Sequence, residues 1–123
     1  MRLNKTQIGV LNEKVEILKN NGILNKKIGT LAASIPLKIE SIDPHAVIKM
    51  GERGITVDNA QSYINNSMIM FEQQNKTTRL YVSNDGNSAV LVVGSMLITA
   101  YPSINFDEGM IAIINEVKKY AGK

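Results

Sequence analysis

The chain has 123 residues, of which 44% are hydrophobic, enough for one contiguous core and so for a single domain over residues 1–123. It contains no cysteine, which excludes disulfides, thiolate nucleophiles and cysteine-ligated zinc. A net charge of +3 with one histidine is a mild basic bias, which is compatible with a phosphate-rich partner but does not identify one.

The first 42 residues predict a helical N-terminal segment. Thr6 can cap a helix that ends at Gly22 and has its apolar residues on one stripe, namely Ile8, Leu11, Val15 and Leu18. Residues 23–34 fit a short helix that is broken near Gly29. The stretch IPLKIES at 35–41 is expected to be extended, because a proline disfavours helix in the residue before it.

Two further helices are predicted between residues 43 and 66. Asp43 followed by Pro44 is a strong helix start, and Gly54 suits a left-handed stop. Thr56 is the expected cap of the next helix, whose buried stripe is predicted to contain Val57, Ala60 and Ile64.

After residue 66 the apolar pattern changes from a helical period to a period of two. The runs 68–71, 77–83, 88–93 and 96–101 predict an antiparallel meander of about four strands. In the second run, Arg79, Tyr81 and Ser83 share one face. The sequence NDGN at 84–87 predicts a hairpin with a tight primed turn, which needs positive φ at both central residues.

Asp107 is the expected cap of a closing helix, whose apolar stripe consists of Met110, Ile113, Ile114 and Val117. The predicted fold class is therefore α+β, with N-terminal helices, an antiparallel sheet of about four strands, and a C-terminal helix packed on the sheet.

One helix carries a charged face. On the helix predicted from residue 44, His45, Lys49 and Arg53 follow one another at intervals of four residues and share an edge. Ala46, Val47 and Met50 are expected on the opposite, apolar face. An imidazole, an ammonium and a guanidinium in this row can form an anion clamp, although the same spacing also occurs on ordinary solvated helices.

The sequence HAVIKMGERGIT at 45–56, with a later strand ending GSMLITAY, resembles a pattern found in small bacterial toxin domains. These domains belong to the barnase, EndoU, colicin and RelE (BECR) ribonuclease superfamily and recur in contact-dependent growth inhibition proteins and other polymorphic toxins. The resemblance covers residues 43–102, so that 43–123 is interpreted as a BECR-like nuclease core. It departs from the pattern at Lys49, where arginine is common, and at Ala100, where valine is common.

The resemblance implies cleavage of RNA, often tRNA, without a metal or other cofactor. It implies catalytic roles for His45, Arg53, Thr99 and Tyr101. It further implies action in the bacterial cytoplasm, after delivery from another cell within a larger secreted or surface protein, and restraint by an acidic immunity protein. Lys49, Arg79 and Tyr81 are predicted to bind RNA.

The residues themselves are compatible with this chemistry. RNA cleavage through the 2′-hydroxyl needs a proton acceptor, a proton donor and groups that stabilise phosphorane charge. A mechanism with two histidines is excluded by the count, so His45 is the candidate base or acid, while Lys49 and Arg53 hold the phosphate. Thr99 can donate to a phosphate oxygen, and Tyr101 can stack on a base or take part in proton transfer.

Other chemistries have less support. The sequence has no glycine-rich phosphate loop after a strand, no nucleophile elbow, no His-Glu-x-x-His and no calcium loop. No window reaches the roughly 18 apolar residues of a membrane span, so we expect no membrane partner. The main alternative is a non-catalytic RNA- or protein-binding module that uses the same basic face.

Overall fold

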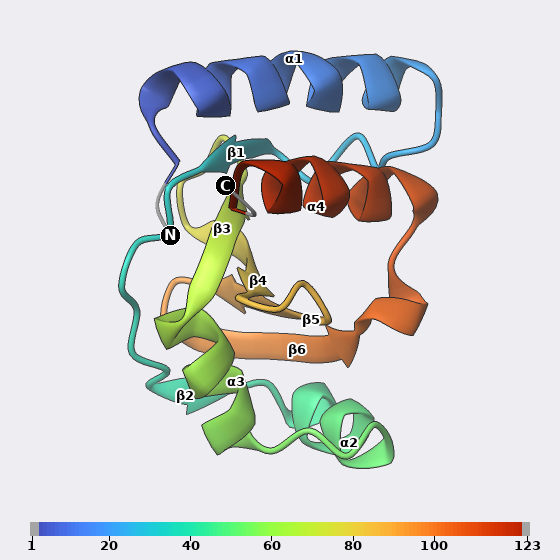
Figure 1. The fold of residues 1–123 in the computed structure, drawn as a ribbon. Coiled ribbons are helices and arrows are strands. Elements are labelled where there is room, and N and C mark those ends of the chain that lie inside the picture. The colour runs from blue at the N-terminus through green and yellow to red at the C-terminus, as the bar shows by residue number, and fades with distance from the viewer. Residues whose placement is uncertain (1–2, 122–123) are drawn as a thin grey trace.

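The computed structural model describes residues 3–121, which form three layers with a mixed sheet in the middle (Figure 1). In chain order, the elements are α1 (Lys5–Asn20), β1 (Thr30–Ala32), β2 (Ser41–Ile42), α2 (Pro44–Glu52), α3 (Val57–Asn65), β3 (Ser67–Glu72), β4 (Thr78–Ser83), β5 (Ser88–Val93), β6 (Met96–Pro102), the 3-10 turn η1 (Ser103–Asn105) and α4 (Glu108–Ala121). This confirms the α+β class.

The sheet has six strands in the order β1-β3-β4-β5-β6-β2. The predicted four-stranded meander is its centre, from β3 to β6, and every pair in it is antiparallel. The expected number of about four strands is wrong, because β1 adds an antiparallel strand beside β3 and β2 adds a strand beside β6. The expectation of a purely antiparallel sheet is wrong at β2, which pairs with β6 in parallel. Both added strands are too short to show a period of two in the sequence.

Each face of the sheet is covered by a pair of helices. On one face, α1 and α4 bury Val15, Phe71 and Ile113 in the first core. On the other face, α2 and α3 bury Met50 and Ile64 in the second core. The alternation of side chains along each strand therefore sends successive residues into two different cores, with neither face left to solvent over the centre of the sheet.

The N-terminal segment differs from the helical prediction. Asn4, not Thr6, caps α1, because the Asn4 side chain accepts from the Gln7 backbone N–H at 2.8 Å while the Gln7 side chain accepts from the Asn4 N–H at 2.9 Å. Residues 30–32 form β1 and not a helix. Gly29, at φ +93°, approaches the Glu72 carbonyl so closely that a Cβ atom would overlap it, which places the next residues beside β3.

The three later helices agree with their predicted caps. Asp43, Thr56 and Asp107 each accept a hydrogen bond from a backbone N–H in the first turn of the helix that follows. Ala46, Met50, Ala60 and Ile64 are buried as expected, whereas Val47 is 62% exposed and Val57 is 38% exposed, so the predicted burial of these two valines is wrong. The sheet lies beneath a narrower stripe of α2 than the sequence suggests.

The β4–β5 hairpin is confirmed, but its turn is not the tight primed turn that was predicted. The strands are joined by four residues, and only Gly86 of Asp85 and Gly86 has positive φ, at +77°. The Gly86 N–H donates to the Ser83 carbonyl at 2.9 Å, which makes an ordinary turn followed by a left-handed glycine.

Candidate functional site

Arg53 joins α2 to β6. It follows the last turn of α2, where Gly54 at φ +70° ends the helix, and Nη1 of Arg53 donates to Oγ1 of Thr99 at 3.1 Å and to the Ala100 carbonyl at 3.0 Å. The guanidinium carbon lies 5.8 Å from the centre of the Tyr101 ring, within the range of a cation–π contact. The structure thus brings together Arg53, Thr99 and Tyr101.

The guanidinium reaches this position around the free edge of the sheet. Strand β2 pairs with β6 only at Met96 and Leu97, so the outer edge of β6 is uncovered beyond that point and the Ala100 carbonyl is available to Arg53. Thr99 is paired with Leu91 and lies, like Tyr101, on the α1/α4 face of the sheet. Arg53 therefore extends from one face of the sheet to the other.

Arg53 retains unused hydrogen-bonding capacity. A guanidinium carries five N–H groups, and two of them, both on Nη1, are used by Thr99 and Ala100. Within residues 3–121, Nε and Nη2 have no hydrogen-bond acceptor, and no carboxylate forms an ion pair with Arg53. A half-buried guanidinium held by neutral acceptors, with one edge open, suits a bidentate contact with a phosphate.

Tyr101 is held as a neutral phenol beside this guanidinium. Burial raises the pKa of Tyr101, and the Asp107 carboxylate raises it further, while the positive charge of Arg53 acts in the opposite direction. The Tyr101 ring also makes an edge-to-face contact with Phe106, with 5.7 Å between the ring centres. At neutral pH the hydroxyl can donate a hydrogen bond, but it is not a base.

His45 lies away from this cluster. Its side chain is 91% exposed, and its Nδ1 atom is 3.4 Å from Oδ1 of Asp43, the residue that caps α2. Eight residues separate His45 from Arg53, which is about 12 Å along the helix axis at 1.5 Å per residue. Within residues 3–121 no hydrogen bond or ion pair joins His45 to Arg53 or Thr99, and the expectation that all three open onto one concave surface stays a prediction.

Lys49 stands one helical turn from each of these residues. Its side chain is 58% exposed and its ammonium is 4.0 Å from Oε2 of Glu52, a loose surface ion pair. His45 and Lys49 thus form an exposed row on α2 that leads to the guanidinium of Arg53.

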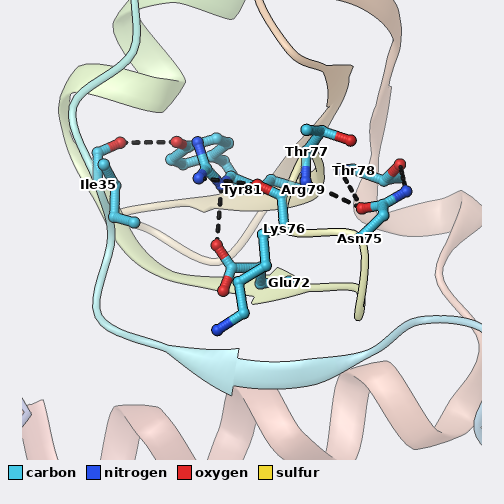
Figure 2. A network of polar contacts seen from close by, with 8 residues as sticks. All are labelled: Ile35, Glu72, Asn75, Lys76, Thr77, Thr78, Arg79 and Tyr81. Atoms are coloured by element: carbon cyan, nitrogen blue, oxygen red, sulfur yellow. Dashed lines mark hydrogen bonds and ion pairs between the residues drawn. The ribbon is translucent and has the colours of Figure 1, made fainter.

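Tyr81 is buried and Arg79 is partly buried, and both are engaged in polar contacts within the fold (Figure 2). Tyr81 has no exposed surface, lies in the second core and donates from its hydroxyl to the Ile35 carbonyl at 2.6 Å. The Arg79 side chain is 19% exposed; its Nε pairs with Glu72 at 3.0 Å and its Nη2 donates to the Lys76 carbonyl. Tyr81 is not available to RNA, because residues of α2 and α3 pack over it in the second core. The Arg79 guanidinium is partly exposed but already paired with Glu72, so its predicted contact with RNA stays without support.

A cavity of about 290 Å³, which the sequence did not suggest, lies next to Tyr101 on the α1/α4 face. Its apolar floor includes Leu80, Leu91 and Met110, and its polar rim includes Gln73 and Asp107. These residues come from β4, β5, α4 and the connections between elements, so no local motif marks them.

Searches of protein-family models, curated proteins and solved structures found no match for this chain. Among residues 3–121 no three histidine, aspartate or glutamate side chains gather in a way that could hold a metal ion. No helix in that same range is long and apolar enough to cross a membrane.

Proposed function

We propose that this protein is a metal-independent endoribonuclease toxin of the BECR type that cleaves RNA, with tRNA as the expected substrate. The observation that carries the proposal is the open edge of Arg53, a positioned guanidinium with three N–H groups available for an anion. A guanidinium edge of this kind binds phosphate or carboxylate in a bidentate manner, and RNA presents phosphates in a row.

In this mechanism the cluster of Arg53, Thr99 and Tyr101 binds the phosphate, and His45 on α2 takes part in proton transfer. Arg53 holds a phosphate, and the Thr99 hydroxyl, which accepts from Arg53, can donate its own proton to a phosphate oxygen. Tyr101 supplies a neutral hydroxyl and a ring face. His45 either accepts the proton of the attacking 2′-hydroxyl or donates one to the leaving 5′-oxygen, the Tyr101 hydroxyl or water makes the other transfer, and Lys49 adds a positive charge. Because His45 and Arg53 are two helical turns apart, this mechanism requires the scissile phosphate to lie over the exposed edge of α2 between them, where the imidazole can reach the phosphodiester that Arg53 holds.

A second candidate is a non-catalytic RNA-binding module. The isolation of His45 favours it, since its one polar side-chain partner among residues 3–121 is Asp43 and no second proton-transfer group of the proposed set lies beside it. Under this alternative the same row of cations on α2 would bind the RNA backbone without cutting it.

Incubation of the purified chain with total tRNA in excess EDTA separates the two candidates. The ribonuclease proposal predicts discrete fragments whose new ends carry a 2′,3′-cyclic phosphate, because the attacking nucleophile is the neighbouring 2′-hydroxyl of the RNA. Bound but intact tRNA would support the binding module and contradict the nuclease.

The His45→Ala variant then tests the role of the imidazole. We expect cleavage to fall by about 10²- to 10⁴-fold, the usual contribution of a proton-transfer group, with RNA affinity nearly unchanged. Full activity in this variant would remove His45 from the mechanism.

As a toxin, the protein would act in the bacterial cytoplasm, reached by delivery from another cell, and a producing cell would need an acidic immunity protein against it. Such a partner would be steered to the basic row on α2. The expectation is that expression of the chain alone arrests bacterial growth and that His45→Ala relieves the arrest; harmless expression of the unaltered chain would contradict this part of the proposal.

A further inference from the structure

The cavity beside Tyr101 and the open edge of Arg53 lie on the same side of the sheet. Leu91, in the floor of the cavity, is the direct cross-strand partner of Thr99, which accepts a hydrogen bond from Arg53. Directly opposed residues have their Cβ atoms about 5 Å apart. Tyr101 belongs to both, because its ring lies below the guanidinium and its side chain lines the cavity. A ligand with an anionic group at Arg53 can therefore place a neighbouring group in the cavity.

The size and lining of the cavity select a flat ring. At about 290 Å³ it is at the lower end of the range of small-molecule sites, roughly 300–1,000 Å³, so it suits a single ring system. Its floor is apolar, while Asn25 and Gln73 at its rim offer side-chain amides that can donate or accept. A nucleobase has this combination of an apolar ring face and a polar edge.

Asp107 adds a preference among the bases. One of its oxygens, Oδ1, accepts from the Met110 N–H at 2.7 Å as the cap of α4, which leaves Oδ2 as an acceptor at the rim of the cavity. A carboxylate accepts from an exocyclic amino group, as carboxylates do from the amino group of cytosine, whereas uracil offers one N3–H between two carbonyl oxygens that repel the carboxylate.

A groove rich in lysine continues from the cavity. It has a volume of about 890 Å³ and shares Lys27 and Gln73 with the cavity. Its two acidic residues, Glu16 and Glu72, are paired with Lys19 and Arg79. Within the described chain, the other lysines of the groove have no carboxylate partner; these are Lys26, Lys27 and Lys76. A nucleotide in the cavity would have cations on both sides for its flanking phosphates.

We propose that this cavity binds one nucleobase of single-stranded RNA, a base that carries an exocyclic amino group, next to the phosphate held by Arg53. The inference rests on the proposed function only in taking RNA as the ligand. It requires no cleavage and would hold equally for a protein that binds RNA without cutting it.

The test is a titration of the full chain, observed by NMR, with the 3′-monophosphates of adenosine, guanosine, cytidine and uridine and with ribose 5-phosphate. We expect at least one nucleotide with an amino group to shift the methyl signals of Leu91 and Met110 in a saturable way and to bind about tenfold more tightly than the uridine nucleotide. Ribose 5-phosphate should not move these signals. Equal binding of all five compounds would show an anion site alone and overturn the proposal.

Two variants and a matched control complete the test. Leu91→Phe should fill part of the cavity and weaken the preferred nucleotide about tenfold or more, while Val10→Phe, at an exposed position of α1 that does not line the cavity, should not. Asp107→Asn keeps a good helix cap and should reduce the preference over uridine. Unchanged base preference in Asp107→Asn would contradict the role of the carboxylate, and equal binding by Leu91→Phe and Val10→Phe would contradict the cavity. The tRNA assay is independent of these results, so failure of the nuclease proposal is distinguishable from failure of the base site.

Discussion

Replacement of Arg53 by alanine should lower both the stability of the fold and its affinity for RNA. The variant loses two hydrogen bonds from a charged donor, at 3.1 and 3.0 Å, and the contact with the Tyr101 ring at 5.8 Å. Hydrogen bonds to charged groups contribute about 1.5–3 kcal/mol each, and an exposed cation–π contact about 0.5–1 kcal/mol. Because the guanidinium is only half-buried, water replaces part of the lost hydrogen bonding in the variant. We therefore expect the free energy of unfolding to fall by about 2–3 kcal/mol.

Lys49→Ala is the matched control, since it also removes one positive charge from the exposed edge of α2. The Lys49 ammonium has a loose ion pair of 4.0 Å with Glu52 and is mostly exposed, so its removal should change the free energy of unfolding by less than about 0.5 kcal/mol. At roughly 4 °C per kcal/mol for a domain of this size, Tm should fall by about 10 °C in Arg53→Ala and stay nearly constant in Lys49→Ala.

RNA affinity measured over a range of salt concentrations gives the second readout. Each variant should reduce the slope of log K against log salt by about one, the value for one lost phosphate contact. Arg53→Ala should lose more affinity at constant salt, because a bidentate fork is lost as well as a charge. An Arg53→Ala protein that melts like the unaltered chain, or that keeps its salt slope, would refute the assignment of the guanidinium as both a link to β6 and a phosphate ligand.

Three further predictions concern the second core and the β4–β5 turn. Tyr81→Phe should lower the free energy of unfolding by about 1 kcal/mol in denaturant titrations and leave RNA affinity unchanged. Weaker RNA binding by the folded variant would show that Tyr81 contacts RNA. Gly86→Ala should be more destabilising than Gly94→Ala. Both glycines have positive φ, but a Cβ at Gly86 would also crowd the side chains of Ile114 and Lys118 on α4, and that of Ile114 is buried. Equal melting temperatures would contradict that contact. Hydrogen bonds, chiefly from the Ser83 hydroxyl, lower the pKa of Asp85 from 3.8 in the folded protein. The Asp85 carboxylate therefore stabilises the fold fully above pH 3.8, and this stabilisation is lost as the pH falls through the lowered folded-state pKa. The stability advantage of the unaltered chain over Asp85→Asn should shrink in acid, and a difference that stays constant with pH would argue against a role of the carboxylate.

The helices could be predicted where their signals are local. Asp43 with Pro44, Thr56 and Asp107 mark helix starts through caps that involve only the next few residues, and the structure has α2, α3 and α4 there. Strands β1 and β2 could not be predicted, since they have three and two residues and exist because β3 and β6 offer an edge to pair with.

The interior position of Tyr81 illustrates a different limit. The alternation in β4 correctly separates Tyr81 and Arg79 from Leu80 and Val82, but a period of two does not tell whether the second face is solvated or covered. Here α2 and α3 cover it. The sequence pattern of β4 therefore predicted correctly which side chains share a face of the strand, but not that Tyr81 lies on a face covered by helices.

The contact between Arg53 and Thr99 spans 46 residues of sequence. It depends on the packing of α2 beside β6, for which no spacing rule exists within the chain, and the resemblance to toxin domains was what grouped these residues. The same resemblance grouped His45 with them, but in the described residues His45 contacts Asp43 and makes no hydrogen bond or ion pair with this group; eight residues of helix correspond to about 12 Å between the two backbone positions. Residues that share one edge of a helix are not necessarily in reach of one another when one of them folds toward a strand.

The most direct test of the central claim uses two RNA oligonucleotides that contain the bond cut in tRNA. They differ only in having ribose or 2′-deoxyribose at the scissile position, and both are incubated with the chain in EDTA. We predict that the ribose strand is cleaved to a 2′,3′-cyclic phosphate, while the deoxy-substituted strand is bound with similar affinity and remains whole. Cleavage of the deoxy-substituted strand, or binding of the ribose strand without any cleavage, would contradict a ribonuclease that uses the 2′-hydroxyl of its substrate.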